Sequence, residues 1–159
     1  MIIRGGHNID PASIEDVALS FPGVALAAAV GRPDPYAGET PILFVAPSPG
    51  QKIDQDALAD HMQAGVAEGP ARPRAIVVVE EMPMTPVGKI FKPRLREIAA
   101  EDAARELLAQ ALPGISVELQ AGHGERGLVL RAKIPAQAAE TARSELGKLP
   151  IGFEIASGT

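Results

Sequence analysis

Apolar residues along this chain recur with two different spacings, which together predict a mixture of helices and strands. Short apolar runs bounded by turn residues predict strands at 24–32, 41–46 and 75–79. Apolar residues three or four positions apart predict helices at 13–20, 54–67 and 93–112. Pro11 suits the first turn of the first helix, and Asp54 is a suitable N-cap for the second. The first two strands are expected to pair as an antiparallel hairpin across a connecting loop at 31–39.

The pattern changes at Pro113-Gly114, where a second part of the chain is expected to begin. The order there is strand 115–119, glycine-rich turn 121–127, strand 128–134, helix 136–146 and strand 151–155. These strands could join the first sheet or form a module of their own. The turn superficially matches the Gly-x-Gly-x-x-Gly phosphate loop, but strands flank it on both sides, which favours a hairpin.

The expected fold class is therefore α+β. Residues 1–112 are predicted to form a small mixed sheet with flanking helices, and residues 113–159 an accessory β-β-α-β extension. A chain of 159 residues can bury a core, which must be built from aliphatic side chains because aromatic residues make up only 3%. The extension buries little area alone, so we expect it to lean on the first domain or on another copy, as a possible homo-oligomer surface.

Charge and composition argue against several classes of function. A net charge of -5 argues against nucleic-acid binding, and no basic segment suited to a membrane surface is present. The absence of cysteine excludes disulfides, thiolate catalysis and thiolate metal sites. His61 and His123 are scattered, so no metal site is expected. The longest apolar run, 24–30, is too short to cross a bilayer and no signal-peptide pattern opens the chain, so a cytoplasmic location is expected.

The most informative segment is 83–96, which reads Pro-Met-Thr-Pro-Val-Gly-Lys-Ile-Phe-Lys-Pro-Arg-Leu-Arg. Thr85 and Pro86 stiffen the approach to a turn, and Gly88 permits a backbone conformation that other residues resist. Lys89 follows directly, so the turn can deliver a compact positive charge to a distant site. A solvated basic turn is the alternative interpretation of any isolated Gly-Lys pair.

Two motifs together resemble a known family, the adenylate-forming (AMP-binding) acyl-CoA synthetases. The first is that family's C-terminal lysine motif, Pro-x-Thr-x-x-Gly-Lys-Ile-x-[Lys/Arg]-x-x-Leu-Arg, and the second its hinge-proximal motif, roughly Ile-x-x-Gly-Gly-x-x-Ile-x-Pro-x-x-Ile-Glu. The matching residues are Pro83, Thr85, Gly88, Lys89, Ile90, Lys92, Leu95 and Arg96 in the first, and Ile2, Gly5, Gly6, Ile9, Pro11, Ile14 and Glu15 in the second. The resemblance covers the chain to the helix after Arg96.

The resemblance implies that Lys89 is the adenylation lysine. Adenylation joins a carboxylate to the α-phosphate of ATP, and a cation between these two anions offsets their repulsion. Thr85 and Gly88 are expected to support Lys89. Lys92, together with Arg94 and Arg96, is expected to belong to a solvated helix face.

The same resemblance implies that the glycine pair, Gly5 and Gly6, lines the passage for the pantetheine arm of CoA. A simple turn is the alternative explanation of the pair. His7 could approach CoA, although a lone loop histidine is more often just exposed, and a contact of Arg4 with CoA phosphate is the weaker expectation. Glu15 is expected to be a first-turn residue that favours the helix N-terminus, without a catalytic role.

The chain thus resembles an excised C-terminal domain with an added initiator Met. The resemblance implies a large N-terminal adenylation domain as its partner, which would hold the ATP phosphates, most of the Mg²⁺ contacts and the small-molecule carboxylic acid. The chain alone is expected to be inactive and to bind neither ATP nor CoA tightly. Two alternatives stay open: an adenylating enzyme that loads a carrier protein, and a binding or regulatory module that kept the fold and lost the chemistry.

Overall fold

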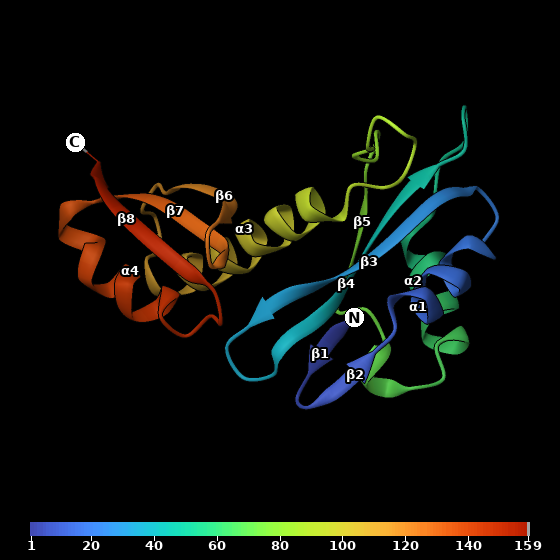
Figure 1. Cartoon of the computed structure of the whole chain (residues 1–159), viewed down its shortest axis with the longest axis horizontal. Coiled ribbons are helices and arrows are strands. Elements are labelled where there is room, and N and C mark those ends of the chain that lie inside the picture. The colour runs from blue at the N-terminus through green and yellow to red at the C-terminus, as the bar shows by residue number, and fades with distance from the viewer. Residues whose placement is uncertain (159) are drawn as a thin grey trace. The chain divides into compact units, whose positions relative to one another are not determined.

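A computed structural model of the protein describes residues 1–158, which form two compact units (Figure 1). The first unit contains residues 1–32 and 39–96, and the second contains residues 33–38 and the chain from Glu97 onward. Each unit combines a β-sheet with helices, so the expected α+β class is confirmed.

The division between the units lies inside helix α3 (Lys92–Ala111), whereas the sequence places a boundary after Leu112. The difference arises because the later part of α3 contributes to the second core. Its small and aliphatic side chains pack there with those of the tail: Ala100, Ala103, Ala104 and Leu108. The accessory role expected for residues 113–159 stays a prediction.

The first unit is built on a five-stranded mixed sheet. Its strands are β1 (Ile2–Arg4), β2 (His7–Ile9), β3 (Val24–Asp34), β4 (Gly38–Pro47) and β5 (Ala75–Val78). The order is β2-β1-β4-β3, with β5 pairing in parallel with β4. The predicted strands are present, and β3 and β4 are neighbours that run in opposite directions (Figure 1).

The loop expected at 31–39 is shorter than predicted, because β3 continues to Asp34 and β4 begins at Gly38. The carboxylate of Asp34 accepts the N–H groups of Tyr36 and Ala37 at 2.9 and 2.8 Å. These two hydrogen bonds close a tight turn, so the strands extend into residues 31–39, where the sequence predicts a loop.

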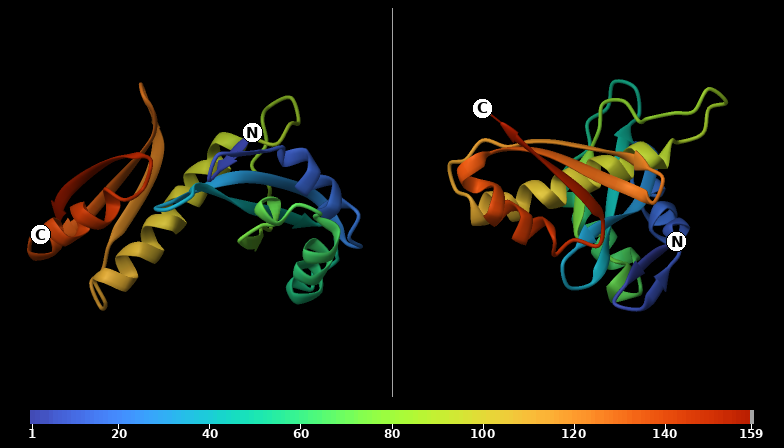
Figure 2. Two further views of the ribbon diagram at one scale, coloured as in Figure 1. Left: turned by 90° about the horizontal axis from the view of Figure 1, so that it is seen from below. Right: turned by 60° about the vertical axis from the view of Figure 1, so that its left-hand side comes forward.

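Helices α1 (Pro11–Leu19) and α2 (Gln55–Gly65) cover one face of this sheet (Figure 2). A short 3₁₀ turn, η1 (Gly69–Ala71), precedes β5. Ile14 of α1 and Leu58 of α2 pack with Leu43 of β4 in one apolar cluster. Ile42 and Phe44, which point to the other face, are buried as well. Because the strands are buried on both faces, their sequences are continuous apolar runs and do not alternate with polar residues.

Both helices begin at aspartate caps, as short polar side chains at this position favour. The carboxylate of Asp54 accepts the N–H groups of Asp56 and Ala57, each at 3.1 Å, which confirms the predicted N-cap. Asp10 caps α1 in the same way, accepting the N–H of Ala12 at 3.0 Å. The two caps fix where the chain leaves β2 and where α2 starts.

The second unit contains a separate three-stranded sheet, so the tail does not extend the first sheet. Its elements are β6 (Glu118–Gly124), β7 (Gly127–Pro135), η2 (Ala136–Ala138), α4 (Ala139–Leu146) and β8 (Gly152–Gly158). Strand β7 lies in the middle, antiparallel to β6 and parallel to β8. Gly124 pairs with Gly127, so the glycine-rich segment is a tight hairpin, as predicted, and β6 extends further into it than expected.

The tail sheet has one apolar face and one charged face. Leu130, Ala132 and Ile134 of β7 are buried in the cluster that includes α3 and α4. The alternate side chains point to the charged face, where Nε of Arg131 lies 3.3 Å from Oε2 of Glu154. None of the large apolar side chains that are exposed within residues 1–158 lies in the tail.

Candidate functional site

The lysine hairpin, residues 83–91, is a tight loop closed by backbone hydrogen bonds. The N–H of Phe91 donates to the carbonyl of Pro83 at 2.7 Å and closes its base. Met84 and Ile90 form an antiparallel bridge one step further along. The loop therefore has a defined shape from its base upward.

The turn at the tip depends on the residue types that the motif supplies. The N–H of Gly88 donates to the carbonyl of Thr85 at 3.0 Å, with Pro86 in the second turn position. Gly88 has φ 81°, a left-handed conformation that side-chain-bearing residues rarely adopt. The hydroxyl of Thr85 accepts the N–H of Lys89 at 3.1 Å. Thr85 and Gly88 thus hold the backbone on both sides of the turn.

Lys89 is exposed, and within residues 1–158 its side chain has no hydrogen-bond or ion-pair partner. Three apolar side chains of the same hairpin are also exposed: Met84 at 43%, Val87 at 82% and Phe91 at 45%. A free ammonium group among solvent-facing apolar side chains is suited to meeting an anionic site on another surface.

The glycine hairpin joins β1 to β2 through Gly5 and Gly6, with Arg4 paired to His7. Both glycines have positive φ, 53° and 84°, as a type I′ turn requires. A Cβ built at either glycine meets no atom within 4 Å. The turn conformation by itself accounts for the glycine pair, and among residues 1–158 nothing fills the space beside the pair.

The two residues that flank the glycine pair differ in whether their side chains are hydrogen-bonded within the domain. The side chain of His7 is exposed. The guanidinium of Arg4 instead donates to the carbonyl of Pro70 at 2.9 Å, so Arg4 fastens the glycine hairpin to η1. Its sequence interpretation as a CoA phosphate contact gains no support from this geometry.

The positions of Glu15 and Lys92 contradict two expectations from the sequence. Glu15 is not in a position to interact with the N-terminus of α1, where no acidic residue occupies the first turn. Its carboxylate instead forms an ion pair with Lys92 at the start of α3, and the same oxygen accepts the N–H of Ala29 at 2.9 Å. The side chains are 19% and 31% exposed, so Lys92 is not part of a solvated helix face. Sequence reasoning missed this pair because its members lie 77 residues apart.

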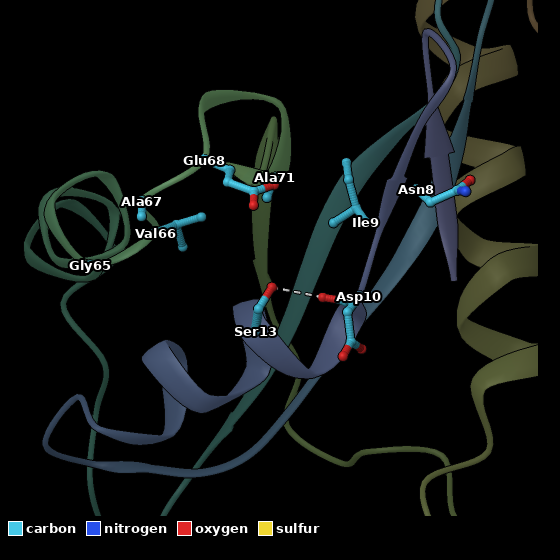
Figure 3. Close-up of a pocket in the computed structure, with 9 residues that line it drawn as sticks. All are labelled: Asn8, Ile9, Asp10, Ser13, Gly65, Val66, Ala67, Glu68 and Ala71. Carbon is cyan, nitrogen blue, oxygen red and sulfur yellow. Dashed lines mark hydrogen bonds between the residues drawn. The ribbon is translucent and has the colours of Figure 1, made fainter.

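A cleft of about 360 Å³ lies between β2, the start of α1 and the end of α2 (Figure 3). Two of its polar side chains serve the start of α1: the hydroxyl of Ser13 donates to the carbonyl of Asp10 at 2.8 Å, and the Asp10 carboxylate caps the helix. Its lining is Asn8, Ile9, Asp10, Ser13, Gly65, Val66, Ala67, Glu68 and Ala71. Neither the lysine hairpin nor the glycine pair contributes to it, so the candidate site consists of exposed loops.

The histidines found in helix and tail have structural partners. Nε2 of His61 lies 2.9 Å from the carbonyl of Val17 and 2.8 Å from the hydroxyl of Ser20, which ties α2 to the end of α1. Nδ1 of His123 lies 3.0 Å from the carboxylate of Glu97. Over residues 1–158, no three histidine or acidic side chains are placed to hold a metal ion. In the same range no helix is long and apolar enough to cross a membrane.

Comparison with known proteins identifies the same family as the two sequence motifs that lie in the lysine hairpin and the glycine hairpin. Residues 13–89 match the AMP-binding enzyme C-terminal domain. The marinolic acid–CoA ligase of a Pseudoalteromonas species is 46% identical over 112 residues, which is 70% of this chain and 17% of that protein.

Solved structures agree in fold. A Mycobacterium tuberculosis fatty acyl CoA synthetase superimposes with a TM-score of 0.56 at 34% identity, over 62% of this chain and 19% of that one. The amide bond synthetase McbA of Marinactinospora thermotolerans superimposes with a TM-score of 0.53 at 31% identity, over 59% of this chain and 19% of that one. This chain thus spans only a small share of each relative. Residues 13–89 thus belong to the family of AMP-binding enzyme C-terminal domains, that is, of the adenylate-forming enzymes.

Proposed function

We propose that this chain is the mobile C-terminal domain of an ATP-dependent acid–CoA ligase, in which Lys89 acts in adenylation. The observation that supports this role most directly is the lysine hairpin. Its turn is held by Thr85 and Gly88, and it carries an exposed ammonium group that has no partner among residues 1–158.

The chemistry requires such a group. A carboxylate oxygen of the substrate attacks the α-phosphorus of ATP, the bond to the bridging oxygen breaks, and pyrophosphate leaves. Two anions meet in this step and negative charge gathers on the α-phosphate oxygens. Lys89 bridges the carboxylate and the α-phosphate and stabilises that charge. The large adenylation domain of the same enzyme supplies the acyl pocket, the phosphate-binding loop and most contacts to Mg²⁺.

The glycine hairpin serves the second step. The thiolate of CoA attacks the acyl carbonyl of acyl-AMP, and AMP leaves as the thioester forms. We assign Gly5 and Gly6 to the wall of the pantetheine passage, which forms only against the large domain, with His7 beside it. The open space next to both glycines fits this assignment. The domain rotates between two poses, each of which presents one of the two hairpins.

A domain exchange tests the function. The segment of the marinolic acid–CoA ligase that matches this chain is replaced by the whole chain, and two half-reactions are measured. Marinolic acid-dependent pyrophosphate exchange reports adenylation, and transfer from supplied acyl-AMP to CoA reports thioester formation. We expect both activities in the chimera, and loss of the first alone when Lys89 becomes alanine.

The alternatives are separate outcomes of the same experiment. A chimera that adenylates but transfers the acyl group only to a carrier protein favours a loading enzyme. A folded chimera that does neither favours a binding or regulatory module. The name of the matched marinolic acid–CoA ligase specifies CoA as its acceptor. This favours an acid–CoA ligase over both alternatives.

A further inference from the structure

We propose that Glu15 and Lys92 are positioning residues for Lys89, a role that rests on the proposed function of that lysine. Their ion pair fixes the base of the lysine hairpin to helix α1 and thereby sets where the ammonium group of Lys89 is carried.

The contacts place this pair at a junction of three elements. One carboxylate oxygen of Glu15, on α1, receives the ammonium of Lys92, on α3, and the backbone N–H of Ala29, on β3. Both side chains are partly withdrawn from solvent, so the pair is less screened than one at the open surface. The N–H of Ala29 also orients the carboxylate, which leaves it little freedom to turn away from Lys92.

The position of Lys92 in the chain links this junction to the candidate catalytic group. Lys92 directly follows Phe91, whose N–H closes the base of the lysine hairpin on Pro83. Leu95, one turn further into α3, is fully buried and provides a second anchor. From base to tip the loop is held by its own hydrogen bonds, so holding the base restricts the whole hairpin, Lys89 included.

Helix α1 also relates the two hairpins to each other. It follows the glycine hairpin directly, through the buried Ile9 and the capping Asp10. The ion pair therefore joins the element that carries Gly5 and Gly6 to the element that carries Lys89. A domain that presents the two loops in turn needs them in a fixed relation, because a misplacement of about 1 Å costs roughly a hundred-fold in rate.

Substitution in the chimera described above separates positioning from simple stabilisation. Lys92→Met removes the ammonium and keeps most of the side chain, and Lys92→Arg keeps a positive charge. Glu15→Gln removes the charge but keeps an oxygen that can accept the N–H of Ala29, so it is the variant least able to disturb folding. Lys52→Met is the matched control, because Lys52 is an exposed lysine outside both hairpins.

We expect Lys92→Met and Glu15→Gln to lower kcat of pyrophosphate exchange by about ten-fold or more, with KM for ATP within about two-fold. Transfer from supplied acyl-AMP should stay within about two-fold of the parent, and Lys92→Arg should restore most of the exchange rate. In the isolated chain, Lys92→Met should speed hydrogen exchange at the amides of Lys89 and Phe91.

Two results would overturn the proposal. One is an equal fall of both half-reactions in Lys92→Met and Glu15→Gln together with a lower Tm, which is the pattern of a merely structural pair. The other is an unchanged exchange rate in both variants. The proposed function has its own test: if Lys89→Ala leaves pyrophosphate exchange intact, the role of Lys89 fails first, whatever Lys92 does.

Discussion

Thr85 holds Lys89 by two hydrogen bonds. Its N–H donates to the carbonyl of Lys89 at 2.7 Å, and its hydroxyl accepts the N–H of Lys89 at 3.1 Å. The backbone of Lys89 is thus gripped from one side by a single residue, while its side chain stays exposed. A loop that must present one ammonium group accurately gains from such a constraint.

Thr85→Val should loosen this grip with little change in shape, since valine has nearly the volume of threonine but no hydroxyl. Loss of one neutral hydrogen bond corresponds to about 0.5–1.5 kcal/mol. Pyrophosphate exchange by the chimera should therefore fall by roughly two- to ten-fold. Thr85→Ser keeps the hydroxyl and serves as control. Equal rates in Thr85→Val and the parent would show that the hydroxyl is dispensable.

Lys89→Ala should lower adenylation by about a hundred-fold or more, the usual cost of removing one contact that stabilises transition-state charge. Transfer from supplied acyl-AMP to CoA should be largely spared, because the role proposed for Lys89 belongs only to the first step. Lys52→Ala, at an exposed position, controls for the loss of one positive charge. Normal pyrophosphate exchange in Lys89→Ala would remove this residue from the site.

Gly6→Leu should block thioester formation and leave adenylation nearly intact, because its side chain would enter the proposed pantetheine passage. The positive φ of Gly6 adds strain of about 1–2 kcal/mol to any such substitution. Gly50→Leu is the matched control, since Gly50 has φ 73° and equally open surroundings. If Gly50→Leu impairs transfer as strongly as Gly6→Leu, the effect is strain and not obstruction.

The parts that could be predicted from sequence are those with a local cause. Asp54 precedes an apolar stripe of helical spacing, and its cap is where that pattern places it. The proline and glycine of the lysine motif indicate a turn, because few residues fit those backbone angles. The fold class followed from the alternation of such segments.

The parts that could not be predicted depend on distant partners or on very short segments. No local pattern links Glu15 to Lys92, which meet only when α1 and the start of α3 have come together. Strands β1 and β2 are too short to show alternation, although the glycine pair between them is a recognised hairpin signal. Ala100, Ala103, Ala104 and Leu108 recur at helical spacing, but this spacing does not indicate which core they join, so the contribution of α3 to the second core could not be predicted.

The tail and α3 share one core, and this determines the outcome of a truncation after Leu112. Removal of residues 113–159 takes away the tail strands and α4, and so uncovers Ala100 and Leu108 on α3. The later part of α3 should then fray, because most of a protein helix's stability comes from packing of its apolar face.

Circular dichroism of the truncated chain should show lost helix beyond the removal of α4 itself, and urea should unfold it at a lower concentration. In the chimera, the same truncation should retain adenylation, since the lysine hairpin, Glu15 and Lys92 lie outside the second core. Size-exclusion chromatography of both forms tests whether the tail also carries self-association. A truncated chimera that stays folded yet no longer adenylates would show that residues 113–159 belong to the catalytic machinery.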